Sequence, residues 1–535
     1  MASATQVIRM LFGGGFATDF GPSVDVVPDQ TGQVVIPFLV DAENVVFELD
    51  GGPQKIGGTS KVNSTVVASG AVVTGVYDYW RQGTGGSATR RRVIHAGTTV
   101  LSDGDDGVFS NTLFTGLNSG AVPNYATFDD FLILANDNTA DVPRSWDQTT
   151  AQNLAGSPPR FSFCVVHKNR AWAAGVYANP SRLYYSANLD PEDWTGAGSG
   201  SIDIDPNDGD MITGLASHKN ELIVFKGPNK GAIHRITGSA PTGGDAFARK
   251  TYSNGLGACW QNAIFRYGDE LGFVSQFGTV HSLSATASFG DFFEAALSRP
   301  IHKWITDHLN FSRLRYISAV NNPSEGRVYF TFSIDSNTTN NCVLVMDYRR
   351  IQQTGRMSWS VIKAYSFGSL GLFVDSNGLR RVLGGGNDGF VKRLNMSARS
   401  LDDASSTAYT AKVTTPYINY GQPIQMKTIS QAAVGIAPAG NYSLTFGWSR
   451  DNNAQQTQTV TQGGGDVLGP SSVNPFTLGT STLGGSQYVD RYMELEEGGE
   501  FRGIQYQVTQ GGLNEKLELH SISASIKGGA ISTEN

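Results

Sequence analysis

Short apolar runs separated by turn residues dominate the pattern of this chain, and residues 211–238 give the clearest example. Three such runs, 212–216, 222–225 and 232–236, are separated by His218-Lys219-Asn220 and Gly227-Pro228-Asn229. Asn and Gly tolerate left-handed backbone and Pro presets φ, so this arrangement is typical of an antiparallel meander. The middle run is apolar on both faces. One meander therefore needs further sheets to cover it on both sides.

The same pattern recurs along much of the chain. Further middle strands are expected at residues 92–96, 131–135, 170–174, 271–274, 327–331 and 381–383. Their starts lie roughly 39 to 56 residues apart, which is the spacing of propeller blades. We therefore predict an all-β chain with a β-propeller of about seven blades. A large irregular β-sandwich remains the alternative, because the repeat is one of pattern and not of identity.

Changes in this pattern divide the chain into three parts. Residues 1–60 begin with a Gly-rich arm, to about Pro37, that we expect to be extended and ordered only by what it packs on. The blades are expected within residues 61–395. Residues 396–535 form longer alternating segments, which predict a β-sandwich platform domain built together with the N-terminal segment. Its Gly- and Ser-rich loop, residues 463–485, is expected to be mobile or to contact a partner.

One stretch, near residues 290–312, departs from the strand pattern. Apolar and aromatic side chains there recur at helical spacing: Phe293, Leu297, Ile301, Trp304, Ile305 and His308. Ser298 is positioned to cap a helix, and Pro300 fits a first helical turn. We expect a short helix on the flank of the propeller.

Composition and charge exclude several classes of protein. The chain has 535 residues, 64 of them Gly, with 16% charged residues and a formal net charge of -7. That charge argues against a domain that grips phosphates. No apolar run approaches the length of a membrane span, and the start carries no secretion signal, so we expect folding in a cytoplasm. Cys164, Cys259 and Cys342 are read as small buried residues rather than as ligands or disulfides.

Motifs for catalysis or cofactors are weak. Gly384, Gly386 and Gly389 match a dinucleotide-like pattern, but a strand follows them where a helix is required, so a turn is expected. Two acidic loops carry closely spaced oxygens, at Asp103, Asp105 and Asp106 and at Asp203, Asp205 and Asp208. Neither has the spacing of a helix-loop-helix calcium site. No nucleophile elbow or zinc-protease motif is present. We therefore predict no enzyme activity, no metal and no cofactor.

A propeller acting on glycans is the second reading. Its paired carboxylates could be far apart in sequence. It predicts a polar pocket on the propeller axis with convergent acids or aromatic residues such as Tyr79 and Trp80.

Several segments resemble virion proteins of short-tailed bacteriophages, in which a propeller forms the tail nozzle or tail tube. The similarity lies at residues 13–19, 41–47 and 51–57, at 184–194, and near the end at 414–418, 501–504 and 517–528. The resemblance implies a ring of subunits, six in that family, below the portal and the head-to-tail adaptor. It further implies tail fibre or tail-tip partners, duplex DNA passing without specific binding, and assembly into the virion tail inside the host cell.

Charge suggests how such a ring would treat DNA. Copies of an acidic subunit make an acidic tube, whose walls repel phosphates so that the duplex slides without sticking. We therefore expect Asp103, Asp105, Asp106, Asp203, Asp205 and Asp208 to face the channel. A receptor-binding tip, contacting its target through residues 463–485, is a third reading.

Overall fold

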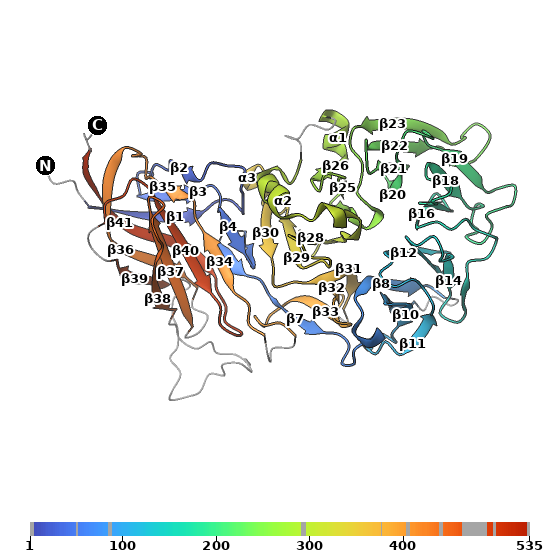
Figure 1. Ribbon diagram of the computed structural model, residues 1–535, viewed down its shortest axis with the longest axis horizontal. Coiled ribbons are helices and arrows are strands. Elements are labelled where there is room, and N and C mark those ends of the chain that lie inside the picture. The colour runs from blue at the N-terminus through green and yellow to red at the C-terminus, as the bar shows by residue number, and fades with distance from the viewer. Residues whose placement is uncertain are drawn as a thin grey trace. The chain divides into compact units, whose positions relative to one another are not determined.

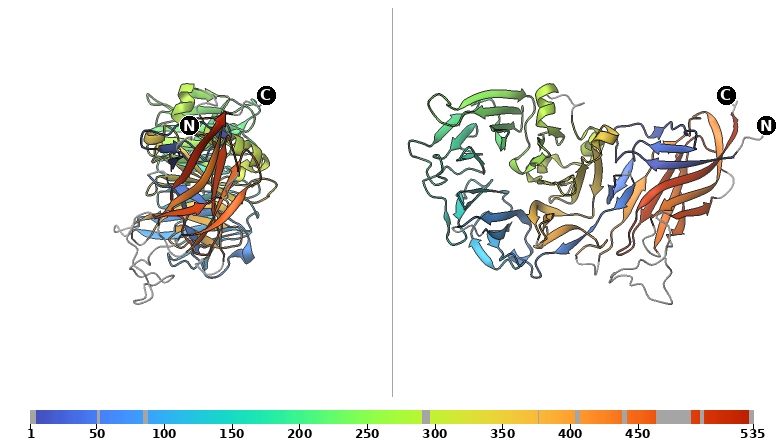
Figure 2. Two further views of the ribbon diagram at one scale, coloured as in Figure 1. Left: turned by 90° about the vertical axis from the view of Figure 1, so that its left-hand side faces the viewer. Right: turned by 180° about the vertical axis from the view of Figure 1, so that it is seen from behind.

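The computed structural model describes residues 5–531 except 50–51, 84–87, 290–295, 376, 403–406, 438–441, 463–488 and 496–498. Figures 1 and 2 show the chain from three sides. Contacts divide it into two compact units. Unit 1 comprises Met1–Ser60, Leu344–Ala364 and Asn395–Asn535, and unit 2 comprises Lys61–Val343 and Tyr365–Leu394.

Unit 2 is the β-propeller. Among its described residues, six of the seven blades are separate small antiparallel sheets, and the blade of residues 319–347 is part of an 11-stranded sheet. The first two blades are β8 (Val73–Arg81), β9 (Thr89–Ala96), β10 (Thr99–Ser102) and β11 (Asn111–Phe114), then β12 (Pro123–Phe128), β13 (Phe131–Asn136), β14 (Arg144–Trp146) and β15 (Ala151–Asn153). The third and fourth are β16 (Phe163–His167), β17 (Arg170–Ala174), β18 (Arg182–Tyr185) and β19 (Gly200–Asp203), then β20 (Met211–His218), β21 (Glu221–Gly227), β22 (Ala232–Thr237) and β23 (Ala248–Asn254). The last three are β24 (Ile264–Tyr267), β25 (Glu270–Val274) and β26 (Val280–Ser282); β27 (Ala319–Asn322), β28 (Arg327–Phe332) and β29 (Cys342–Asp347); and β31 (Phe367–Val374), β32 (Arg380–Gly386), β33 (Val391–Met396) and β7 (Gly58–Lys61). Each expected middle strand is the second strand of its blade.

The first strands of the blades close into a ring. Each contacts the first strand of the next blade, except that β20 contacts the 3-10 turn η2 (Gln261–Ala263) leading into β24. β31 of the last blade contacts β8 of the first, where Ser369 Oγ donates to the Val73 carbonyl at 2.9 Å. The chain also closes at its ends, since the Val62 amide donates to the Val391 carbonyl at 2.7 Å. The ring therefore leaves no blade at a free end.

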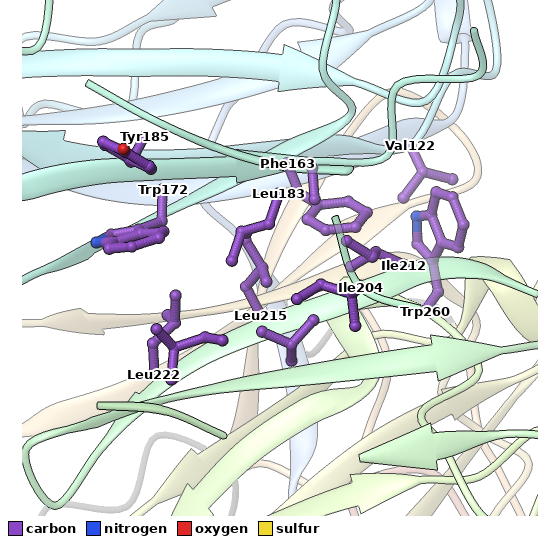
Figure 3. Close-up of a cluster of buried hydrophobic side chains, with 13 residues drawn as sticks. Val122, Phe163, Trp172, Leu183, Tyr185, Ile204, Ile212, Leu215, Leu222 and Trp260 are labelled. Carbon is purple, nitrogen blue, oxygen red and sulfur yellow. The ribbon is translucent and has the colours of Figure 1, made fainter. Parts of the chain in front are cut away.

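Turn chemistry and core packing both follow from the sequence pattern. Lys219 and Asn220 have φ values of 42° and 67°, the left-handed pair that a tight hairpin needs, and Lys168 and Asn169 repeat it at 46° and 58°. The runs that they join are buried between blades. Figure 3 shows Trp172 and Leu183 of the third blade packed near Leu215 and Leu222 of the fourth. Burial of each such side chain contributes roughly 1.5–3 kcal/mol before the entropy cost of folding.

A helical segment interrupts the propeller as expected. It contains α1 (Leu283–Phe289), η4 (Arg299–Ile301), α2 (His302–His308) and η5 (Phe311–Tyr316), and Pro300 lies in the first turn of η4. Ser298 is the N-cap residue of η4, but its side chain makes no capping hydrogen bond. Its hydroxyl instead accepts a hydrogen bond from the Val280 amide at 2.9 Å, because this end of the segment packs on β26 and the strand competes for the oxygen. Phe293 lies outside the described residues.

Unit 1 is the β-sandwich. One sheet has the order β3 (Gln33–Ile36), β1 (Thr5–Phe12), β41 (Leu519–Ile531), β36 (Gln425–Ile436) and β39 (Val489–Glu494). The other contains β2 (Ser23–Val24), β35 (Tyr417–Ile418), β40 (Ile504–Gln510), β34 (Ala411–Thr414), β4 (Asp41–Glu43) and β30 (Ser358–Ile362), with β37 (Ser443–Arg450) joined to β40 and β38 (Gln456–Thr461) joined to β37. A hairpin of β5 (Val45–Phe47) and β6 (Pro53–Lys55), the short helix α3 (Ile351–Thr354) and, in unit 2, the turn η1 (Ala68–Gly70) complete the described elements.

The core of the sandwich joins the two sheets. Tyr506 of β40 and Tyr420 are buried, and their hydroxyls lie 2.8 Å apart. The Tyr420 hydroxyl also lies 3.7 Å from the sulfur of Met10 on β1, in the facing sheet. Along β40, buried positions alternate with half-buried ones, which is the period of a strand with one face on a core.

The N-terminal arm is extended and ordered by pairing, because its strand β1 runs antiparallel to β41 and parallel to β3. One expectation needs correction. Residues 344–364, expected in the propeller, belong to unit 1 by their contacts, although residues 344–347 complete strand β29 of a blade. The reason is a long-range pairing: β30 lies parallel to β4 with Val361 opposite Glu43, and the Phe16 amide donates to the Trp359 carbonyl at 3.1 Å.

Candidate functional site

Two cavities lie among the innermost strands of the propeller. One has a volume of about 220 Å³ and is lined from β8, β12, η2, β24, β27 and β31, with Tyr77, Tyr125 and Gln261 among its residues. The other has a volume of about 100 Å³. Thr74, Asn262 and Ser318 line both cavities, so they follow the propeller axis together. This axis is where propellers commonly bind small molecules, and it is the first place to look for a site.

The lining of these two cavities is polar and almost uncharged. It contains no Asp or Glu, and Arg313 is its single charged side chain. Arg313 packs over the Tyr316 ring, with its guanidinium carbon 3.5 Å from the ring centroid, and Arg315 approaches the same ring at 4.7 Å. These cation–π contacts hold Tyr316 between two cations. The arrangement has no acid that could donate or accept a proton in hydrolysis.

The aromatic residues at the axis are different from those expected. Tyr77 and Tyr125 stack with ring centroids 5.2 Å apart, and the Tyr77 hydroxyl lies 2.9 Å from Thr127 Oγ1. Burial raises the pKa of Tyr77. Tyr79 and Trp80 line neither cavity. Tyr79 is buried against Trp146, and its hydroxyl donates to the Asp130 carbonyl, because its position on β8 faces the neighbouring blade.

The first acidic loop holds the backbone in place. Asp103 is 2% exposed and accepts hydrogen bonds from the amide of Arg92 at 2.9 Å and from its Nε at 2.7 Å. The Gly107 amide donates to the same carboxylate at 3.1 Å. Asp103 is therefore a buried acceptor that braces the strand carrying Arg92. Asp105 and Asp106 are exposed.

The outer residues of that loop are partly neutralised. Asp105 Oδ1 lies 3.6 Å from Arg90 Nη2 and 3.7 Å from Arg92 Nη2. The Val108 amide donates to Asp106 at 2.8 Å and lowers the pKa of that carboxyl. Asp105 thus lies near two arginines, and the lowered pKa keeps Asp106 ionised.

The second acidic loop is built around the ammonium group of Lys226. This side chain is fully buried at the end of β21. Its Nζ donates to Ser181 Oγ at 3.2 Å, to the carbonyls of Ile204 and Asp205 at 2.8 Å each, and to Asp208 Oδ2 at 2.7 Å. The ammonium thus occupies the oxygen-lined position that a bound cation would take. Burial raises the pKa of Asp208, but the hydrogen bond and charge of Lys226 and the backbone amides around Asp208 together leave that pKa lowered.

The other acids of the second loop also have cationic partners. Arg182 donates to both oxygens of Asp203, at 2.7 and 3.0 Å, and this lowers the pKa of Asp203. Asp205 accepts from Arg249 Nη1 at 2.5 Å and lies 3.4 Å from His234 Nε2. The two acidic loops are therefore sites of internal pairing rather than a free acidic surface.

One sequence feature points to the Lys226 site, namely a lysine directly after the buried run of β21. Asn262, Arg313 and Tyr316 carried no such signal, since they come from connections between strands. The cysteine reading is confirmed, because Cys164, Cys259 and Cys342 are free and buried. Burial raises the pKa of Cys164 and of Cys259 to about 12, so neither thiol is reactive.

Within the described ranges, no group of three or more His, Cys, Asp or Glu residues is arranged to hold a metal ion. No helix in those ranges has the length and apolar character needed to cross a bilayer.

Comparisons with known proteins give distant structural matches. No family model and no curated protein matches this chain. Among solved structures, YCF48 bound to D1 peptide is 11% identical with a TM-score of 0.36, over 63% of this chain and 97% of that one. The N-terminal domain of Nup159 is 9% identical with a TM-score of 0.34, over 66% and 98%. An exo-β-1,3-galactanase from Phanerochaete chrysosporium with galactose is 11% identical with a TM-score of 0.28, over 88% and 100%.

Proposed function

We propose that this chain is a structural subunit of the tail of a short-tailed bacteriophage. In this proposal, copies form a ring below the portal and adaptor that extends the path of DNA ejection. The observation that carries it is the division of the chain: the two terminal segments together build one sandwich, and the propeller is inserted between them. This is the division that the resemblance to tail nozzle proteins implies, with a platform for docking and a propeller that extends the tube.

The axial cavities bear on where DNA would run. Cavities of about 100 and 220 Å³ are far too small for a duplex, whose major groove alone is about 12 Å wide. A conduit must therefore lie between copies of the chain. With the two acidic loops internally paired, repulsion of phosphates would come from the net charge of -7 on each subunit as a whole.

The cavity lining argues against the glycan-hydrolysing reading. Glycoside hydrolysis uses a pair of carboxyl groups beside the scissile bond, and neither axial cavity has one. The proposal accordingly assigns no catalytic role and no cofactor. The third reading, a receptor-binding tip, depends on residues 463–485, which lie outside the described residues.

Electron microscopy of the purified protein, with its solution mass measured on the same sample, tests the proposal. We expect rings or short tubes with a central hole, sixfold if the resemblance extends to subunit number. The same imaging is repeated with the portal and adaptor proteins present. A chain that stays monomeric in both conditions and binds neither protein would contradict a tail role.

A further inference from the structure

The larger axial cavity has room for a small molecule. Its volume is about 220 Å³, and its lining comes from five of the seven blades, through β8, β12, η2, β24, β27 and β31. A cavity of about 150 Å³ is large enough to take up a benzene ring, whereas sites for drug-sized molecules measure roughly 300–1,000 Å³. The axial cavity therefore fits one substituted six-membered ring or a short chain.

No charged side chain lines this cavity. Its polar side chains carry hydroxyl or amide groups only. The one charged residue of the axial cavities, Arg313, lines the smaller of the two, where it packs over the Tyr316 ring. Moving an ion out of water into a site without an opposite charge is costly. The lining therefore favours a neutral occupant.

Two amide side chains of the lining each keep one group free, because the backbone holds the other. Asn124 Oδ1 accepts a hydrogen bond from the Cys164 amide at 2.9 Å, so the side chain is oriented and its Nδ2 has no acceptor among the described residues. Asn262 is held in the opposite sense. Its Nδ2 donates to the Pro123 carbonyl at 3.0 Å, and its Oδ1 receives no hydrogen bond from the described part of the chain. Solvent reaches both free atoms.

A hydroxyl group completes the set. Ser318 Oγ accepts a hydrogen bond from the Leu370 amide at 3.1 Å, and no described residue accepts the hydrogen of that hydroxyl. Free donors from Asn124 and Ser318 and a free acceptor from Asn262 thus line one cavity, from three different blades. A ligand hydroxyl can both donate and accept, so it satisfies either kind of group, whereas an ion satisfies one kind and opposes the other.

We propose that the larger axial cavity binds one neutral polyhydroxylated molecule, either a single sugar ring or a short linear polyol. Water fills a polar cavity of this size when no ligand is bound, and ligand hydroxyls replace the hydrogen bonds of the waters that they displace. Because no acid lines the cavity, hydrolysis does not follow binding. This inference goes beyond the tail proposal and does not depend on it.

Calorimetric titration and saturation-transfer NMR of the full-length protein test the site with three probes, namely glucose, sorbitol and glucuronate. Without an ionic contact, we expect saturable binding of glucose or sorbitol with a Kd on the order of 1 mM. Glucuronate keeps the ring of glucose but carries a carboxylate. It should bind at least roughly tenfold more weakly than glucose, because its charge must be desolvated.

Two substitutions locate the binding. Asn124→Asp keeps the oxygen that accepts from Cys164 but replaces the free donors with a charged acceptor, and Ser318→Ala removes the hydroxyl. Asn138→Asp is the matched control, because Asn138 Oδ1 also accepts from a backbone amide, that of Ala140 at 2.9 Å, and Asn138 lines neither cavity. Circular dichroism and the unfolding midpoint establish that each variant is folded. We expect binding roughly tenfold weaker in the two cavity variants and unchanged in the control.

Three results would overturn the site. A wild-type protein that binds neither glucose nor sorbitol saturably holds only water in the cavity. Wild-type affinity in both cavity variants would place the binding elsewhere, and equal affinity for glucuronate and glucose would contradict the neutral class. If one cavity variant does not fold, the other decides. None of these results bears on the proposed ring, which electron microscopy tests separately.

Discussion

The two units differ in how their strands are closed and in how much apolar surface they expose. In the propeller, the blades close into a ring, and the acids of the two loops are held by Arg92, Arg182, Arg249 and Lys226. In the sandwich, β38 pairs with β37 alone among the described residues, and its six residues carry no charge. The four most exposed large apolar side chains among the described residues all belong to the sandwich: Val7, Val27, Ile424 and Tyr492, at 66–78% exposure. The most exposed apolar surface of the described residues therefore lies on the sandwich.

The largest expected effect is a loss of propeller stability when the buried ammonium of Lys226 is removed. Lys226→Met removes the buried ammonium and leaves Asp208 and two carbonyls without their donor. Removing one partner of a buried charge pair typically costs about 3–5 kcal/mol. Equilibrium unfolding in denaturant measures the loss, with exposed Lys230→Met as the control. Equal stability of the two variants would show that the ammonium does not organise the second acidic loop.

Acid should weaken the propeller before the sandwich. Burial lowers the pKa of His95, His167 and His281 to about 4, and all three belong to unit 2. Because the folded state holds these groups neutral, their contribution is complete above pH 6.5 and is lost as the pH falls toward 4. Each costs about 2 kcal/mol between pH 6.5 and 5.

The measurement is the unfolding free energy against pH, for the wild-type chain and for His95→Gln. The variant should lose stability at pH 7, where the hydrogen bond with Thr74 Oγ1 is disturbed, but should depend less on pH below 6.5. An unchanged slope would mean that His95 titrates normally in the folded protein.

A smaller effect is expected in the core of the sandwich. Tyr506→Phe removes the hydroxyl that lies 2.8 Å from that of Tyr420 while keeping the ring. The loss should be about 1 kcal/mol, the usual net value of one hydrogen bond. Tyr420→Phe is the reciprocal variant. If both singles and the double variant cost the same, the two hydroxyls act as one pair; full additivity would contradict that coupling.

The smallest effect is expected at the surface pair of the propeller. Asp203→Asn removes the ion pair with Arg182, both of whose side chains are substantially exposed. Exposed pairs contribute little because water and salt screen them. No resolvable change in the thermal midpoint is expected, and a large drop would show that this loop matters more to folding than its exposure indicates.

Local pattern was enough to predict the repeat and the turns. The middle strands of the blades, the left-handed turn at Lys219 and Asn220, and the buried free cysteines all follow from neighbours in the sequence. These features depend on strand periodicity and on intrinsic backbone preference, which a few adjacent residues decide.

Tertiary structure decided what each residue faces. Asp103 turns inward because Arg92, on the adjacent strand, requires an acceptor, and Lys226 is buried because Ile204, Asp205 and Asp208 surround it. Residues 344–364 join the sandwich through the pairing of Val361 with Glu43, more than 300 positions earlier in the chain. Alternation within a strand indicates that one face is buried. Which partner covers that face is set by long-range closure, and local sequence carries no record of it.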